Sequence, residues 1–499
     1  MTKTANAKRN IIFDLFIKLV TILVAFFSIP IYLNCLGDEL FGANQLLSQL
    51  MTYINLAEAG LGASLLVALY GTLANNDTEG SVNLIAAAHR IYNYIGIFVC
   101  ISATIFSFFI GNLFDIAVEH RFQVQVAFIF YSCSIGISLC MMAPTMLIRA
   151  DQKYYNIAAF FLVLNPFGVI ISIIFLKLGF SLISVAFSVF VANFFAYYLS
   201  NRRVKKLYPW LKLKSEHPNY KQLKSVKYVF IDKLLVVAVF QTDYILISYF
   251  ISVAAVSTYA IYNTFFIVLR TFLWIPINHL QYGLGEMFYK SDLESIRRIW
   301  RDVISAGFIL VGAVCITVYF QIDYFVSLWV GKEYVLDKPI VILFLINLVY
   351  LITVHPSTMV VSARNMFKER VPGSFMEMSL NLIFSVILMK KYGVFGAVLG
   401  TTIGHLSSNA WFIPYLASKI LEIRFSAYWI MVLKYVLSII AVFFIVREGR
   451  AYYGGGSWFS FFTKSSIIFL SSLFLLVITN LYSYDTRCML RRLKAIIKL

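Results

Sequence analysis

Long apolar runs recur along almost the whole chain, and they constrain its fold more than any other feature. A hydropathy window of about 19 residues separates fourteen helix-length spans, at approximately 10–33, 41–70, 91–111, 123–147, 155–176, 180–200, 228–251, 255–284, 303–321, 339–362, 371–389, 394–416, 429–446 and 458–480. Each span can cross the roughly 30 Å hydrocarbon core of a bilayer as a helix. Since 60% of the residues are hydrophobic, the sequence predicts an all-α polytopic membrane protein.

The first apolar run is expected to be retained as a helix. It follows Lys3, Lys8 and Arg9, is too long for the core of a signal peptide and lacks a small-residue cleavage site. The six cysteines are scattered without a CxxC or zinc-like spacing. We therefore expect no disulfide, metal or other cofactor.

The charges of the loops predict the orientation. With the N-terminus inside, the inner segments carry 29 Lys and Arg, and the outer side carries 9 when Lys464 at the outer end of the last span is included. Basic residues concentrate on the cytoplasmic side of membrane proteins. Both termini are therefore predicted to be cytoplasmic, and the net charge of +18 requires no nucleic-acid partner.

Residues 201–227 form the longest hydrophilic segment and separate the first six spans from the next six. We interpret this segment as a basic cytoplasmic linker, a solvated tether that touches anionic lipid head groups. A specific binding role is the alternative.

An internal repeat relates the two sides of this linker. Thr145-Met146 and Thr358-Met359 are 213 residues apart, the pair Gly179 and Gly393 is 214 apart, and the pair Lys18 and Lys233 is 215 apart. Three matches at nearly one offset indicate a duplicated six-helix unit, with a substrate path between the copies. The predicted domains are an N-terminal half (1–200), the linker (201–227), a C-terminal half (228–416), and two accessory helices with a basic tail (417–499).

The segment "IPIYLNCLGDELFGANQLL", followed by "EAGLGAS", resembles the opening of the Wzx-type O-antigen and exopolysaccharide flippases. The resemblance consists of a late proline in the first helix, Leu-Gly with an acidic residue in the outer turn, and an acidic-x-Gly further on, carried by Pro30, Gly37, Glu39, Gly42, Glu58 and Gly60. These flippases belong to the multidrug/oligosaccharidyl-lipid/polysaccharide (MOP) exporters, and their two six-helix halves plus two helices match the fourteen spans here.

The resemblance implies a flippase that moves an undecaprenyl-pyrophosphate-linked oligosaccharide from the cytoplasmic to the outer leaflet of a bacterial inner membrane. It also implies a polysaccharide polymerase and a chain-length regulator as partners. The sequence contains no Walker A motif, so we expect alternating access coupled to an ion gradient or to membrane potential.

Arg270 is the deepest cation, near the middle of the span 255–284. Asn263 lies two turns before it on the same helix face, and Trp274 lies one turn after it. A guanidinium can bind pyrophosphate through two parallel hydrogen bonds, and an indole can stack on a sugar, so we predict substrate binding here. The alternative is a buried ion pair with Glu58 or Asp243.

The second span carries a polar stripe at helical spacing, made of Asn44, Ser48, Met51, Asn55, Glu58 and Gly62. We predict that Asn44 and Asn55 line the substrate cavity. Hydrogen bonding between neighbouring helices is the alternative.

Further charged residues lie within the spans. Asp14 and Lys18 are four residues apart in the order that favours an internal pair, and Lys18 and Lys233 occupy matching repeat positions. We predict that these two lysines bind substrate, with self-neutralisation of Lys18 and snorkelling of Lys233 as alternatives. The acidic candidates for ion coupling are Asp14, Glu58, Asp232 and Asp243.

Single histidines lie in the spans, namely His279, His355 and His405. We interpret them as interhelical contacts, and a proton relay is the alternative. Gly396, Gly400 and Gly404 predict either a packing face or a bend.

Two other classes of function stay open. The spans hold acidic as well as basic residues, so a cation-coupled multidrug antiporter of the same superfamily fits the charge count. A membrane glycan polymerase or ligase would act on the same lipids, and Asp38-Glu39 resembles the acidic site of some of them. The longest outer segment, at about 331–338 with its flanks, is short for such an enzyme.

Overall fold

The computed structural model describes residues 3–220, 227–290, 293–364, 366–449, 456–483 and 486–487. Within these ranges the chain is helical and has no strand. Its elements are α1 (Lys3–Ala74), α2 (Thr78–Leu113), α3 (Val118–Ala150), α4 (Tyr155–Lys177), α5 (Leu182–Leu207), α6 (Lys227–Phe250), α7 (Val253–Lys290), α8 (Leu293–Trp329), the 3₁₀ helix η2 (Lys332–Tyr334), α9 (Lys338–Ala363), α10 (Phe367–Ser407), α11 (Asn409–Ile420), α12 (Phe425–Glu448) and α13 (Trp458–Asn480).

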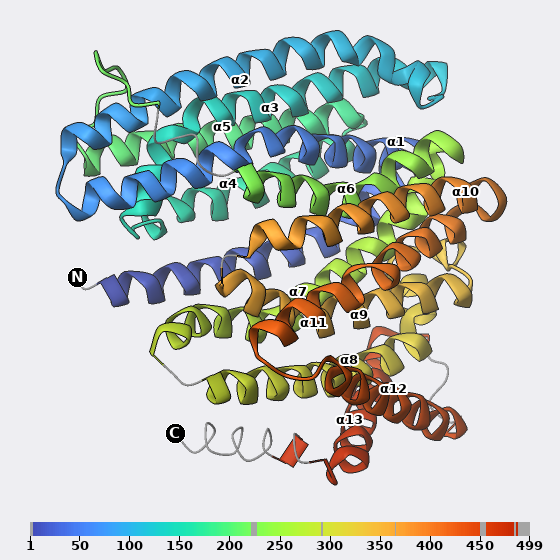
Figure 1. Cartoon of the computed structure of the whole chain (residues 1–499). Helices are drawn as coiled ribbons and strands as arrows, with labels where there is room; N and C mark the ends of the chain where they lie inside the picture. Colours follow the sequence, from blue (N-terminus) through green and yellow to red (C-terminus); the bar gives the residue numbers. More distant parts are fainter. Residues whose placement is uncertain are drawn as a thin grey trace. The chain divides into compact units, whose positions relative to one another are not determined.

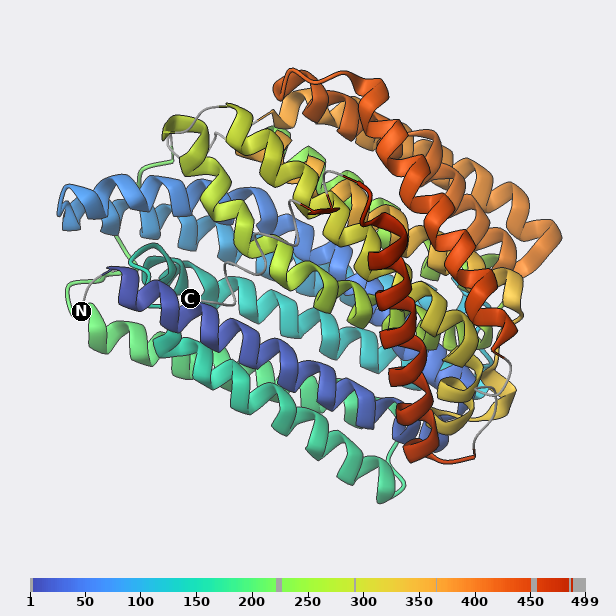
Figure 2. The same ribbon diagram turned by 90° about the horizontal axis from the view of Figure 1, so that it is seen from below.

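The chain divides into two compact units, Met1–Ala260 and Ile261–Leu499. In the first unit, α3 packs against α1, α2 and α5, while α4 and α6 pack against α1 (Figure 1). In the second unit, α9 packs against α8, α10 and α11, and α8 also contacts α12 and α13. Figure 2 shows the long helices of each unit running lengthwise beside one another. The boundary between the units falls inside α7, after Ala260, whereas the predicted C-terminal half begins at residue 228. The domain limits proposed from the sequence stay a prediction.

Eleven segments of the described chain are long and apolar enough to span a membrane. Two of them contain a break, at Gly37 with φ of 71° and at Gly393 with φ of 56°. This left-handed region is one that glycine adopts readily. Counting both sides of each break, taking Ser64–Ala74 as the continuation of α1 and adding the shorter apolar helix Leu234–Phe250 gives fourteen candidate spans in the described residues. The predicted all-α polytopic fold is confirmed.

Corresponding backbone features occur at both copies of the predicted repeat. Pro144 lies near the end of α3, and Pro356 lies near the end of α9. Gly179 before α5 has φ of 88°, and Gly393 before the second half of α10 has φ of 56°. These matching positions agree with a duplicated unit.

Several helices continue beyond the spans that hydropathy predicts. α2 begins at Thr78 rather than near residue 91, and the Asp77 side chain caps it by accepting from the Gly80 N–H at 2.7 Å. α8 begins at Leu293 rather than near residue 303. A helix satisfies its backbone internally and can continue into water, whereas hydropathy detects only its apolar part. The segments 71–90, 285–290 and 293–302 are therefore largely helical and not the loops expected from the sequence.

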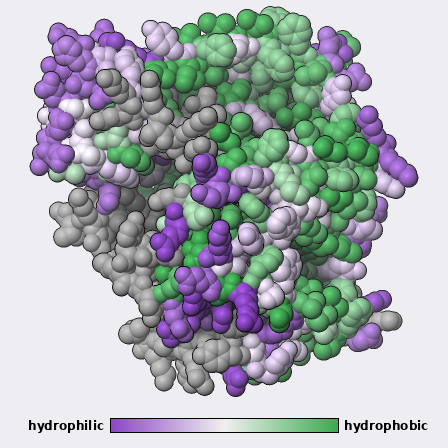
Figure 3. Space-filling view, viewed as in Figure 1, coloured by the Kyte–Doolittle hydropathy of each residue, from purple (hydrophilic) through white to green (hydrophobic). Residues whose placement is uncertain are grey.

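The surface carries a broad apolar area. Phe98 on α2 and Phe459 on α13 expose 70% and 82% of their surface. In the first unit, Figure 3 shows hydrophobic residues along α2 and α3 and hydrophilic residues gathered at the end where the α1–α2 turn lies. A soluble protein would not expose so large an apolar patch. The chain is a multi-pass membrane protein.

The described part of the predicted linker packs onto the helices of the first unit, to which it belongs. Tyr208 and Leu211 are buried, with 6% and 9% of their surface exposed. Arg90 on α2 donates to the Ser215 carbonyl at 3.2 Å, and the Asn219 N–H donates to the Asn83 carbonyl at 3.2 Å. The described part of the linker is therefore held on α2 rather than solvated throughout.

Candidate functional site

Arg270 belongs to a stacked group of side chains in the second unit. Its guanidinium carbon lies 4.8 Å from the ring centre of Trp274, one turn further along α7. The indole N–H donates to the Leu351 carbonyl on α9 at 3.3 Å. The His355 ring stacks on the indole with centres 4.6 Å apart and planes at 19°. We call Arg270, Trp274 and His355 the arginine stack.

The arginine stack brings the Arg270 charge to the contact between α7 and α9. The spacing of four residues places Arg270 and Trp274 on one face of α7, and α9 supplies His355 from the other side of the contact. Arg370, in the first turns of α10, also acts electrostatically on His355, as Arg270 does. A guanidinium over an indole gains about 2 kcal/mol when it is desolvated. The arrangement holds the Arg270 guanidinium against the indole, and its contact with an anionic substrate stays a prediction.

The structure joins two of the three residues predicted for this site. Arg270 and Trp274 are in contact, while Asn263 is half-buried two turns earlier on α7. The indole packs on Arg270 and His355, so its predicted contact with a sugar stays a prediction. His355 makes an interhelical contact, which agrees with its interpretation from the sequence.

The polar stripe on the second half of α1 has two different parts. Asn44 is buried and accepts a hydrogen bond from the Tyr131 hydroxyl on α3 at 2.6 Å. Met51 is also buried, and its sulfur accepts from Ser132 at 3.6 Å. Asn55, by contrast, is exposed. Asn44 therefore contacts a neighbouring helix, whereas Asn55 is open to solvent or ligand within its unit.

Asp243, a predicted coupling residue, lies in a buried polar group of the first unit. Tyr259 donates to its carboxylate at 3.0 Å. The neighbouring Thr242 is hydrogen-bonded to Tyr53 at 2.6 Å, which ties α6 to α1. The Asp243 carboxylate thus has a hydrogen-bonded partner on α7, and its role in ion coupling stays a prediction.

The remaining charged candidates cannot be placed. The side chains of Asp14, Lys18, Glu58, Asp232, Lys233 and His279 lie outside the part of the chain that the structure describes. The roles predicted for them stay predictions.

A second buried carboxylate, Glu377, was not selected as a site residue from the sequence. Tyr350 on α9 donates to it at 3.1 Å, and it is also hydrogen-bonded to His405 and Asn409. We call these four residues the Glu377 cluster. Three helices, α9, α10 and α11, contribute to it, which explains why no local motif revealed it. His405 makes the interhelical contact that the sequence predicted.

The glycine repeat explains how this cluster forms. A Cβ at Gly396 would overlap the backbone of Leu388, and a Cβ at Gly404 would lie 3.0 Å from the Glu377 carbonyl oxygen. The glycines thus let the second half of α10 pack directly on its first half, across the break at Gly393. Of the two predicted roles of the repeat, the structure shows the packing face.

The "LGDE" motif organises the other end of the first unit. Gly37 makes the turn, the Asp38 carbonyl accepts from Ser257 at 2.5 Å, and the Glu39 carboxylate accepts from the Ala117 N–H at 2.7 Å. A Cβ at Gly42 would overlap the Val253 carbonyl. The motif therefore connects α1 to the starts of α3 and α7, and its acidic residues have structural contacts.

Comparison with known proteins gives matches of fold. No protein-family model and no curated protein matches the sequence. Among solved structures, the lipid II flippase MurJ in an inward closed conformation superimposes with a TM-score of 0.74 at 14% identity, covering 94% of this chain and 99% of that chain.

Two further solved structures are similar. An inward-facing multidrug resistance MATE family transporter of the MOP superfamily gives a TM-score of 0.63 at 15% identity, covering 83% of this chain and 99% of the other. A MOP superfamily transporter from Pyrococcus furiosus, described by a binding pocket of reverse polarity, gives 0.59 at 14% identity, covering 85% and 98%. The chain has the MOP transporter fold. Flippases and drug transporters share this fold, so the fold agrees with the superfamily named from the sequence and leaves the substrate to the site residues.

Proposed function

We propose that this protein is a flippase of the Wzx type, which moves an undecaprenyl-pyrophosphate-linked oligosaccharide to the outer leaflet by alternating access. The arginine stack is the observation that carries this proposal. Pyrophosphate is the part of the substrate least tolerant of hydrocarbon, and a guanidinium is the side chain best suited to bind it through paired hydrogen bonds. The fold match with a lipid II flippase supports the same class of activity.

An apolar cavity in the second unit supports a substrate with a polyprenyl tail. Its volume is about 370 Å³, and it lies among α7, α8 and α13. Its lining includes the rings of Phe265, Phe325, Phe461, Phe462 and Phe469. Phe265 and Phe325 are 4.8 Å apart between ring centres, so part of the cavity wall is aromatic. A hydrocarbon tail would find a matching surface there.

The energy source in this proposal is an ion gradient or membrane potential. Asp14, Glu58, Asp232 and Asp243 are the coupling candidates from the sequence, and the Glu377 cluster adds a fifth carboxylate. A carboxylate buried among hydrogen-bond donors carries a charge that a bound proton or Na⁺ can neutralise. Such a group could couple transport to an ion gradient.

The proposed location is the bacterial inner membrane, with both termini and the linker in the cytoplasm. The proposed partners are the lipid-linked oligosaccharide, a polysaccharide polymerase and a chain-length regulator. A cation-coupled multidrug antiporter of the same fold is the competing function, and the experiment below separates the two.

Deletion of the gene in the source bacterium should abolish the surface polysaccharide and leave lipid-linked oligosaccharide in the inner leaflet. Arg270→Ala should fail to restore the polysaccharide although the protein reaches the membrane, and Arg270→Lys should restore it partly, because an ammonium keeps the charge but loses the planar fork. Unchanged polysaccharide in the deletion strain, together with hypersensitivity to cationic drugs, would favour the antiporter.

A further inference from the structure

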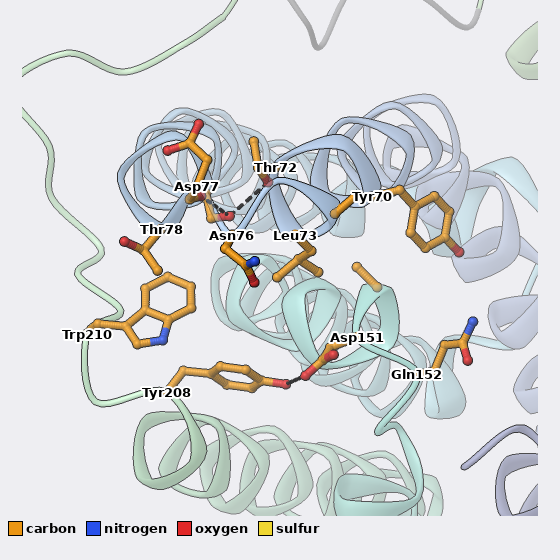
Figure 4. A pocket seen from close by; sticks show the side chains of 13 residues that line it. Tyr70, Thr72, Leu73, Asn76, Asp77, Thr78, Asp151, Gln152, Tyr208 and Trp210 are labelled. Carbon is orange, nitrogen blue, oxygen red and sulfur yellow. Dashed lines mark hydrogen bonds between the residues drawn. The ribbon is translucent and has the colours of Figure 1, made fainter. Parts of the chain in front are cut away.

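A second cavity lies at one end of the first unit, whereas the arginine stack belongs to the second unit. Its volume is about 620 Å³, which is within the roughly 300–1,000 Å³ of typical small-molecule sites. The end of α1, the start of α2, the end of α3 and the linker after α5 form its walls (Figure 4). In the proposed orientation, all four segments lie on the cytoplasmic side.

Aromatic side chains from the linker form one wall. Tyr208 and Trp210 meet edge to face with ring centres 5.8 Å apart. The Tyr208 hydroxyl donates to Asp151 at 2.6 Å, and Lys153 pairs with the same carboxylate at 2.7 Å. Burial and the Asp151 carboxylate both raise the pKa of Tyr208, so its hydroxyl stays a proton donor. These contacts fix the linker on the end of α3 and hold the two rings against the cavity.

Amide side chains from two helix ends also line the cavity. Asn76 and Gln152 have φ of 54° and 55°, and they are two of four non-glycine residues with positive φ among those described. Both residues lie just after the last turn of a helix, where a left-handed residue commonly ends the helix. Figure 4 shows Asn76 across the open space from Tyr208 and Asp151, with Gln152 and Tyr70 further along.

The charges of the lining disfavour a phosphate ligand. None of the lining residues is a Lys or Arg, and both acidic residues already have partners. Asp77 caps α2, and Asp151 binds Tyr208 and Lys153. The remaining hydrogen-bonding groups are neutral amides and hydroxyls, including Thr72 and Ser81, which are hydrogen-bonded to each other at 2.8 Å.

We propose that this cavity binds a pyranose of the glycan on the lipid-linked substrate before translocation. An indole presents a flat apolar surface to the C–H groups of a sugar ring, and amides and hydroxyls pair with its hydroxyl groups. This inference rests on the proposed function, since only a substrate with a cytoplasmic glycan would use the site. The cavity would then select the sugar, while the arginine stack binds the pyrophosphate.

The test uses the full-length protein in lipid nanodiscs and the oligosaccharide released by mild acid from the lipid-linked pool of the source bacterium. Saturation-transfer NMR should show transfer to the sugar protons. Trp210→Ala should weaken binding at least about fivefold, and Trp210→Phe should restore most of it. Gln152→Ala, at an exposed position, should weaken binding without affecting folding.

One control accompanies these variants. Tyr220→Ala removes an exposed aromatic residue of the same linker that does not line the cavity. It should bind the released oligosaccharide as the wild type does.

The outcomes separate this site from the proposed function. No saturation transfer from the wild type to the sugar protons, or equal transfer from Trp210→Ala and Gln152→Ala, would overturn the sugar site even if intact lipid-linked oligosaccharide is translocated. Binding that depends on Trp210, without translocation of the intact lipid, would uphold the site and refute the flippase. Failure of both measurements would refute both.

Discussion

The Glu377 cluster allows a quantitative prediction of stability. Glu377 is buried and accepts hydrogen bonds from Tyr350, His405 and Asn409. A hydrogen bond to a charged group contributes about 1.5–3 kcal/mol, against about 0.5–1.5 kcal/mol between neutral groups. Glu377→Gln keeps the shape, removes the charge and replaces one accepting oxygen by an NH2 that only donates. The three accepted bonds are therefore weakened or lost, which should cost about 3 kcal/mol in the free energy of unfolding.

The measurement is unfolding of the purified protein in mixed detergent micelles. The matched control is Glu369→Gln, the same chemical change at an exposed position in the first turn of α10, and it should cost less than about 0.5 kcal/mol. In a His405→Ala background, Glu377→Gln should cost at least about 1 kcal/mol less than it does alone, because neighbouring groups in one network are not additive. Wild-type stability of Glu377→Gln, or strict additivity with His405→Ala, would refute the cluster as a connected network.

Three other predictions follow from the fold. With the native cysteines removed, Asn55→Cys should react with a membrane-impermeant thiol reagent and Asn44→Cys should not, because Asn44 is buried against Tyr131; equal labelling would contradict the division of the stripe. Gly42→Ala should destabilise the protein by about 1–3 kcal/mol, since its Cβ would overlap the Val253 carbonyl. The control Gly71→Ala should not, because a Cβ there meets nothing within 4 Å. Similar melting temperatures of the two variants would argue against the close contact between Gly42 and Val253. Reporter fusions in residues 201–220 and at both termini should report a cytoplasmic location, and an external linker would overturn the orientation.

The sequence predicted the helices well because each span is a local property. Hydropathy depends on some twenty neighbouring residues, and the bilayer requires helices to satisfy their own backbone groups. The breaks at Gly37 and Gly393 were also detectable, since glycine supplies the positive φ at both positions. The helix ends were less accessible, as shown by the early start of α2 at Thr78, because polar helix outside the membrane has no hydropathy signal.

The sites were harder to predict because their members come from distant segments. The spacing of Arg270 and Trp274 along one helix revealed their contact, but nothing in the sequence connected them with His355. The Glu377 cluster joins Tyr350 and Asn409 from other helices. The cavity proposed to bind a sugar joins Asn76 and Trp210. Both sites therefore depend on tertiary packing. Asn44 shows the reverse problem, because a polar residue on an apolar helix fits a cavity wall and a helix contact equally well.

Translocation in a defined system tests the central claim most directly. The protein would be reconstituted into vesicles that contain undecaprenyl-pyrophosphate-linked oligosaccharide from the source bacterium, with an ion gradient or potential applied. The measured quantity is the fraction of glycan that becomes accessible to an external glycan-modifying enzyme. We predict protein-dependent exposure with the wild type, reduced exposure with Arg270→Lys and background exposure with Arg270→Ala. Background exposure with the wild type under every gradient, or full exposure with Arg270→Ala, would contradict an anionic lipid-linked substrate bound at the arginine stack.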